Sequence, residues 1–81
     1  MSNNIELVGV GGWAWQLQKL LMDVYDVPML EAGRAVAQIV TWVAEGTEVT
    51  MELLLPLLEG LGLSAEAAEI VAAAIIAALA A

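Results

Sequence analysis

The sequence predicts an all-α fold of about four apolar helices, which form a hairpin or small bundle and pack with neighbouring copies of the chain. Three observations predict this. Apolar residues make up 62% of the 81 residues, compared with roughly 45–50% in soluble domains. Polar side chains recur every three or four residues, which is the period of a helix. Glycine, proline, serine and threonine divide the chain into segments of helical length.

The first twelve residues, MSNNIELVGVGG, predict an N-terminal arm that precedes a single helical domain over residues 13–81. The arm has no lysine or arginine, and glycine interrupts its apolar stretch, so it lacks the pattern of a secretory signal peptide. Gly11 and Gly12 would also suit an export leader that is cleaved after the glycine pair. We favour an extended arm before the first helix.

The first helix is expected over residues 13–26, where four polar residues recur at helical spacing. They are Gln16, Lys19, Asp23 and Asp26. Because they form one line along the helix, apolar side chains cover most of its circumference. Trp13 and Trp15 lie two residues apart and therefore point about 200° away from each other. A helix that is apolar on nearly all sides is either buried in a larger body or surrounded by lipid. We therefore expect Trp13 and Trp15 both to lie in helix contacts.

The second helix is expected over residues 28–45, with Asp26 as its N-cap and Pro28 in its first turn. Its polar line repeats the spacing of the first and consists of Glu31, Arg34, Gln38, Thr41 and Glu45. Gly33 and Ala37 are small residues four apart, a spacing that lets helix axes approach closely. We therefore expect Gly33, Ala37 and Trp42 to lie in helix contacts.

The third helix is expected over residues 47–59, with Thr47 as its N-cap and Glu48 favoured in its first turn by the helix dipole. Pro56 should kink this helix or end its first part. Gly60 and Gly62 should then break it. The third and fourth helices could fold back as a hairpin or continue end to end.

The fourth helix is expected over residues 64–81, with Ser64 as its cap. No residue after Glu69 is charged, and this run of 12 residues, 70–81, is shorter than the roughly 20 apolar residues that cross a bilayer. Its alanines, including Ala74, Ala77 and Ala78, suit close packing against other helices. Packing within an assembly is therefore favoured over a membrane span.

Charge limits the range of partners. Ten acidic residues face only two cations, Lys19 and Arg34, so the net charge is −8. This charge opposes binding to nucleic-acid phosphates and to anionic lipids. In a polymer, however, one cation per subunit is multiplied by the number of subunits. Lys19 and Arg34 are therefore the candidates for facing nucleic acid that an assembly encloses.

The acids predict a solvated outer face whose repulsion keeps particles soluble and separate. An alternative is a calcium or magnesium site that combines Glu45, Glu48 and Glu52 beside Gly46. No loop of the EF-hand kind surrounds these residues, so we favour the solvated face and predict no metal site.

Nothing in the sequence predicts catalysis or a bound cofactor. The chain has no histidine or cysteine, and its only serines are Ser2 and Ser64. It therefore lacks both a nucleophile–base pair and a phosphate-binding loop. We predict a protein that is not an enzyme and that has no catalytic or cofactor-binding residues.

The short acidic N-terminal part, the apolar helices with small residues and the length below 100 residues resemble the small all-helical coat proteins of filamentous and rod-shaped viruses. This resemblance implies a structural, self-assembling capsid subunit in a virion or an extracellular filament. Its partners would be other copies of itself and the nucleic acid that the assembly encloses. Filamentous-phage coats end in a basic cluster that meets DNA, whereas EIVAAAIIAALAA, over residues 69–81, contains no basic residue. Contact with DNA through the C-terminus is therefore not expected.

The alternative is a small membrane-embedded or membrane-permeabilising helical protein located in the membrane. In this respect the chain resembles circular bacteriocins, which are compact bundles of four or five apolar helices. Those proteins are usually cationic, so the net charge of −8 argues against this alternative.

Overall fold

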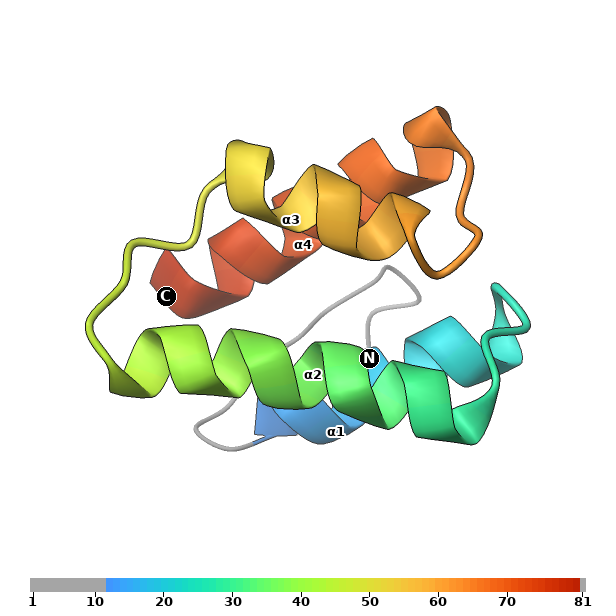
Figure 1. The fold of residues 1–81 in the computed structure, drawn as a ribbon, viewed down its shortest axis with the longest axis horizontal. Helices are drawn as coiled ribbons and strands as arrows, with labels where there is room; N and C mark the ends of the chain where they lie inside the picture. The colour runs from blue at the N-terminus through green and yellow to red at the C-terminus, as the bar shows by residue number, and fades with distance from the viewer. Residues whose placement is uncertain (1–11, 81) are drawn as a thin grey trace, which may run out of the picture.

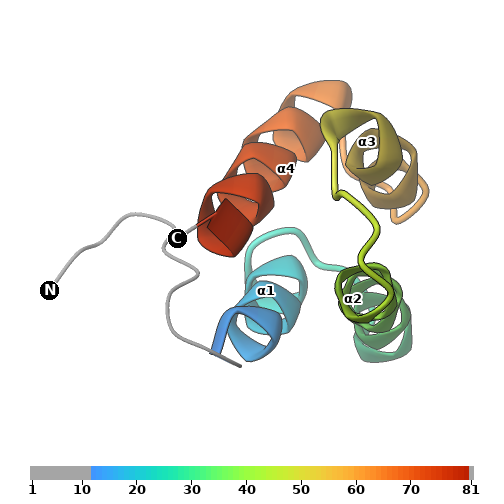
Figure 2. The same ribbon diagram turned by 90° about the vertical axis from the view of Figure 1, so that its left-hand side faces the viewer.

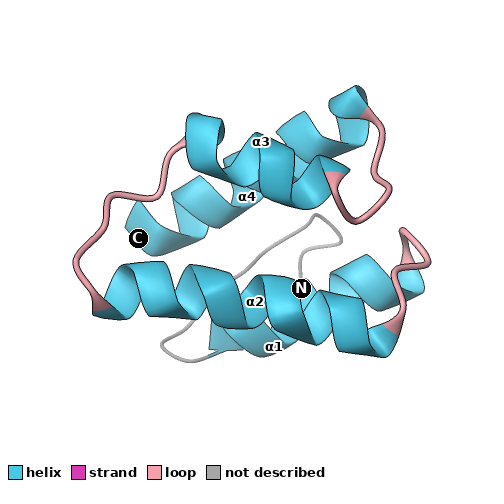
Figure 3. Cartoon of the chain, viewed as in Figure 1, coloured by secondary structure: helices cyan, strands magenta, loops and turns pink. Residues whose placement is uncertain are grey.

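The computed structural model describes residues 12–80, which form four α-helices and no strand (Figures 1 and 3). Helix α1 spans Gly12–Asp23, α2 spans Met29–Ala44, α3 spans Met51–Glu59 and α4 spans Ala65–Ala80. The predicted all-α class is therefore confirmed for this part of the chain. The expected N-terminal arm lies outside the described residues except for Gly12, which begins α1.

The four helices form two helical hairpins that stack in two layers. Helix α1 packs on α2, α3 packs on α4, and α1 also contacts α4. Figure 1 shows α3 and α4 in one layer above α1 and α2, and Figure 2 shows the same two layers from the side. The third and fourth helices thus fold back on each other, which decides between the hairpin and the end-to-end arrangement.

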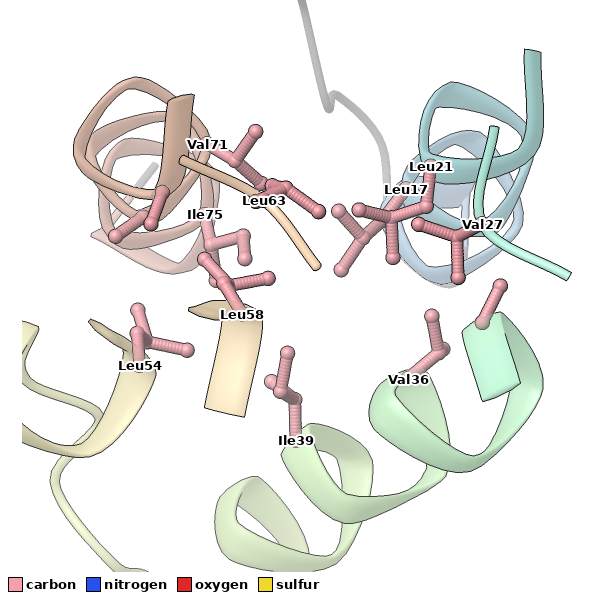
Figure 4. Close-up of a cluster of buried hydrophobic side chains, with 13 residues drawn as sticks. Leu17, Leu21, Val27, Val36, Ile39, Leu54, Leu58, Leu63, Val71 and Ile75 are labelled. Atoms are coloured by element: carbon pink, nitrogen blue, oxygen red, sulfur yellow. The ribbon is translucent and has the colours of Figure 1, made fainter. Parts of the chain in front are cut away.

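The core lies between the two layers and is entirely apolar. Every helix contributes fully buried side chains to it, as Figure 4 shows: Leu17 and Leu21 from α1, Ile39 from α2, Leu54 and Leu58 from α3, and Val71 and Ile75 from α4. Burial of each such side chain stabilises the fold by about 1.5–3 kcal/mol. Within residues 12–80 no polar or charged residue is buried. Apolar packing therefore holds one hairpin on the other.

The N-cap of α3 is Thr50, so the prediction of Thr47 is wrong. The Leu53 backbone N–H donates to Thr50 Oγ1 at 3.4 Å. Thr47 instead closes α2, because its N–H donates to the carbonyl of Trp42 at 2.9 Å while Gly46 adopts a φ of +80°. This is the Schellman arrangement, in which the residue after a left-handed glycine bonds back into the helix. Helix α3 therefore begins three residues later than the sequence predicted, after Thr50.

The expectation that Asp26 caps α2 is also wrong. Asp26 adopts a φ of +57°, and the N-cap position belongs to Pro28, which makes no side-chain capping bond. Val27 before this position and Ala32 in the first turn are both buried in the core. Two apolar residues in these positions form a hydrophobic staple. An apolar contact thus replaces the polar cap at this end of α2.

The connection between α3 and α4 follows the sequence closely. Helix α3 runs through Pro56 and ends at Glu59, and Gly62 adopts a φ of +101°, which a residue with a side chain rarely adopts. The predicted cap of the last helix is confirmed, because the Ala67 backbone N–H donates to Ser64 Oγ at 3.1 Å. The chain therefore reverses between Glu59 and Ser64, and α4 returns along α3.

Candidate functional site

Lys19 and Arg34, the residues predicted to face nucleic acid, are both exposed on the outer side of the α1–α2 hairpin. Lys19 lies two residues from the buried Leu17 and two from the buried Leu21, and Arg34 has buried neighbours at the same two spacings. Residues two apart on a helix point about 200° from each other. Both cations therefore point away from the core, and Arg34 also lines the groove between α2 and the end of α3.

We call this outer surface the α1–α2 face and define it by Trp15, Lys19, Leu30, Arg34 and Ala37, all of which are exposed. Trp15 is 65% exposed and Leu30 is 66% exposed. On each helix a large apolar side chain precedes the cation by four residues, so it lies one helical turn away on the same side. The face thus combines two exposed apolar groups with the two cations, and the exposed Asp23 lies one turn after Lys19 on the same side.

The opposite surface, which we call the α3–α4 face, is acidic. It consists of the exposed residues Glu52, Pro56, Glu59, Glu66, Ile70, Ala73 and Ala77. Pro56 lies two residues from the fully buried Leu54 and Leu58. Ile70, which is 54% exposed, lies at the same spacing from two buried alanines. These residues therefore point away from the core, and Figure 2 shows that their helices, α3 and α4, lie on the side opposite α1 and α2.

Several residues that we expected in helix contacts lie against the core. They are Trp13, Trp42, Ala74 and Ala78, all half-buried. Gly33 is also half-buried, and a Cβ atom at this position would lie 3.8 Å from Nε2 of Gln18 on α1. Gly33 is thus part of the contact between α1 and α2.

Trp15, Ala37 and Ala77 were also expected in helix contacts, but they are exposed. They point away from the other helices of their own chain. For these three residues the expectation therefore concerns contacts with other copies and stays a prediction.

Two open grooves lie along the sides, where the hairpins meet. A groove of about 530 Å³ separates α2 from the end of α3 and is lined by Glu31, Arg34, Ala35, Gln38, Leu57, Gly60 and Leu61. A groove of about 350 Å³ separates the α2–α3 connection from the end of α4, and Glu48, Val49, Ile76 and Leu79 are among its lining residues. The first groove has one acid and one cation in its lining, Glu31 and Arg34, and the second has one acid, Glu48.

The alternative of a cation site at Glu45, Glu48 and Glu52 gains no support from the geometry. Within residues 12–80 no three acidic side chains come together closely enough to hold a metal ion. In the same part of the chain, no helix combines the length and the apolar character that crossing a bilayer requires.

Sequence reasoning missed two features. Gln16 was placed in the polar line of the first helix together with the exposed Lys19, yet its Oε1 atom is buried without a hydrogen-bond partner in the described structure. The second is the separation of charge, with both cations on one outer face and three glutamates on the other. The sequence holds part of the signal for this separation, because Lys19, Arg34, Glu52 and Glu66 each stand two positions from a buried residue.

No known protein family, curated protein or solved structure matches the chain. The proposed function therefore rests on the two outer faces and on the resemblance drawn from the sequence.

Proposed function

We propose that the protein is a structural subunit that assembles with copies of itself, and that the assembly is the coat of a rod-shaped or filamentous virion. The observation that carries the proposal is the number of large apolar side chains left exposed on so small a domain. They are Trp15, Val24, Met29, Leu30, Val40, Val43 and Ile70. Extensive exposed apolar surface marks a site of interaction with protein or membrane.

The energetics favour contacts made by whole faces. Removing the exposed part of one such side chain from water contributes roughly 1–2 kcal/mol, at about 25 cal/mol for each Å². Association costs about 4–15 kcal/mol in lost translational and rotational freedom. A single apolar contact therefore cannot hold two copies together. A polymer in which every subunit buries two faces gains this stabilisation repeatedly.

The two cations support the proposal that the assembly encloses nucleic acid, as a virion does. Lys19 and Arg34 lie on one outer face, so a polymer would repeat them in a regular array. Each neutralised phosphate releases counterions, and many weak contacts along one polymer add up to stable binding. The resemblance to small helical coat proteins supports the same conclusion. Nucleic acid is thus the proposed cargo of the assembly, although the net charge of the free subunit is −8.

The test begins with purification in the absence of detergent, followed by light scattering and negative-stain microscopy. We expect long rods of uniform width, and nucleic acid inside them that resists nuclease. A stable monomer of 8.5 kDa at every concentration would refute assembly. Rods without protected nucleic acid would refute the virion and leave an empty filament. Protein that is recovered only in detergent and makes lipid vesicles leak would instead favour the membrane-permeabilising alternative.

A further inference from the structure

We infer that the groove between the α2–α3 connection and the end of α4 binds the N-terminal segment of the same chain, with Ile5 and Leu7 as its two anchoring side chains. We call this groove the α2–α4 groove. The segment belongs to residues 1–11, which lie outside the described residues. The inference goes beyond the proposed function and does not depend on it, because one subunit contains both the groove and its occupant.

The α2–α4 groove has a mainly apolar lining that continues the hydrophobic core. Val49, Ile76 and Leu79 are half-buried, and all three pack against the core. Val43 also lines the groove and is 44% exposed. The groove therefore leaves an edge of the core in contact with water. An apolar occupant would extend the core by removing this edge from water.

The composition of the N-terminal segment matches this groove and not the larger one. The stretch IELVGV, residues 5–10, contains four large apolar side chains and one charge, Glu6. The groove of about 530 Å³ is lined in part by Glu31 and Arg34, whose charged groups would lose water beneath an apolar segment. The α2–α4 groove has one charged side chain in its lining, that of Glu48. It is therefore the groove that suits an apolar occupant.

The geometry of an extended segment decides which side chains enter the groove. Successive side chains of an extended chain point to opposite sides. Ile5 and Leu7 therefore share one side, and Glu6 and Val8 share the other. When Ile5 and Leu7 enter the groove, the Glu6 carboxylate points into water and away from Glu48. The opposite orientation would bury Glu6 beside Glu48, which both desolvation and repulsion of like charges oppose.

The segment begins close enough to reach the groove. It joins α1 at Gly12, and α1 contacts α4. Figures 1 and 2 show that the start of α1 lies at the same end of the molecule as the ends of α2 and α4. The axes of helices in contact are about 8–10 Å apart. The five residues from Gly12 back to Leu7 span up to about 16–18 Å when extended, so Leu7 can reach past the end of α4.

The covalent link favours the groove of the same chain over the groove of another copy. A segment that is tethered within reach of its site acts at an effective concentration in the millimolar range. In a solution of free subunits, the groove of a second copy competes only at the concentration of the protein. At micromolar protein the occupant is therefore the segment of the same chain.

The test is a disulfide between the segment and the groove, because the chain has no cysteine of its own. In Leu7→Cys/Val43→Cys, the thiols can join only where the two Cα atoms come within about 4.4–6.8 Å. The matched control is Leu7→Cys/Val40→Cys, because Val40 is 42% exposed, close to the 44% of Val43, but does not line the groove. With oxidised glutathione and micromolar protein, we expect the groove pair to form its intramolecular disulfide about ten times faster than the control pair, because docking raises the effective concentration of the thiols.

Two further substitutions distinguish the two sides of the segment. In the Leu7→Cys/Val43→Cys background, Ile5→Asn should slow the reaction toward the rate of the control, because it removes the second anchor. Val8→Asn in the same background should leave the rate unchanged, because Val8 points away from the groove. Circular dichroism checks that each variant is folded. If Val43→Cys does not fold, Thr47→Cys replaces it, because Thr47 is exposed and also lines the groove.

Electrophoresis without reducing agent distinguishes the outcomes. A disulfide within the monomer that forms faster for the groove pair, and that Ile5→Asn slows more than Val8→Asn, supports docking within the chain. Equal rates for the groove pair and the control pair, or equal slowing by the two asparagine substitutions, would overturn it. Disulfide-linked dimers in place of the monomer would also overturn it, because the segment would then occupy the groove of another copy. None of these outcomes decides whether the protein forms rods, which electron microscopy tests separately.

Discussion

Two isoleucines of α4 allow the core and the outer surface to be separated with the same substitution. Ile75 is fully buried between the hairpins, whereas Ile70 is 54% exposed on the α3–α4 face. Replacing either by alanine removes the same three carbons, and burial of these carbons in a core is worth about 2.4 kcal/mol at 0.8 kcal/mol per methylene. At Ile75 a cavity adds to this loss, so we expect the free energy of unfolding to fall by about 3–4 kcal/mol.

At Ile70 about half of the side chain is already in water, so the same substitution should lower the free energy of unfolding by about 1 kcal/mol or less. The higher helix propensity of alanine offsets part of even that loss. A chain of this length has a total stability of roughly 4–12 kcal/mol. Ile75→Ala therefore removes a large share of the stability of the subunit, and Ile70→Ala removes little.

The assay is urea unfolding followed by far-UV circular dichroism, at a protein concentration low enough to keep the subunits apart. Sedimentation at higher concentration then compares the amount of polymer. We expect Ile70→Ala to weaken assembly without lowering the urea midpoint much. Equal losses of unfolding free energy for the two variants would refute the reasoning, because Ile70 would then be buried within the single chain.

Three further comparisons test the helix ends and the alanines of α4. Thr50→Ala should cost about 0.5–2 kcal/mol of stability because Thr50 caps α3, whereas Thr47→Ala should change the stability by no more than about 0.5 kcal/mol. If thermal unfolding shows the larger loss of stability for Thr47→Ala, α3 begins at Thr47. Gly62→Ala should cost about 1 kcal/mol or more, because alanine is strained at a φ of +101°, and a variant as stable as the wild type would contradict this turn geometry. Ala74→Glu should destabilise the fold itself, because Ala74 packs against the core. Ala77→Glu should instead keep the fold and reduce polymer yield, and unchanged yield would remove Ala77 from the contact surface.

The ends of the helices could be predicted only where the residues that cap or break a helix act on their immediate neighbours in the chain. The cap at Ser64 and the break of the helix before Gly62 depend on residues within one turn of each other, and both were predicted, whereas the reversal of the chain at this break was left open. Asp26 and Thr47 were assigned as caps by residue type alone. Their actual conformations depend on Val27 being drawn into the core and on Gly46 closing α2, and these are effects of tertiary packing and of backbone geometry beyond a single residue.

The outer faces show a different limit. The narrow polar line of the first two helices correctly indicated that large apolar groups stay exposed, of which Trp15 is the clearest case. The polar line could not show which side of each helix meets the other hairpin, because a helix that is apolar nearly all round offers several equivalent faces. Only the packing of the hairpins assigns Leu17 and Ile75 to the core and Trp15 and Ile70 to the surface.

The pairing of neighbouring helices into hairpins has a consequence for the order of events during assembly. Because α1 pairs with α2 and α3 with α4, most contacts join segments that are close in the chain, and helical proteins of this kind fold within microseconds to milliseconds. Two specific surfaces typically meet with rate constants of about 10⁵–10⁷ M⁻¹s⁻¹, which at micromolar concentration gives encounters about 0.1–10 times per second. A newly made chain therefore completes its fold before it meets a neighbour, and the polymer that we propose would grow by adding finished subunits.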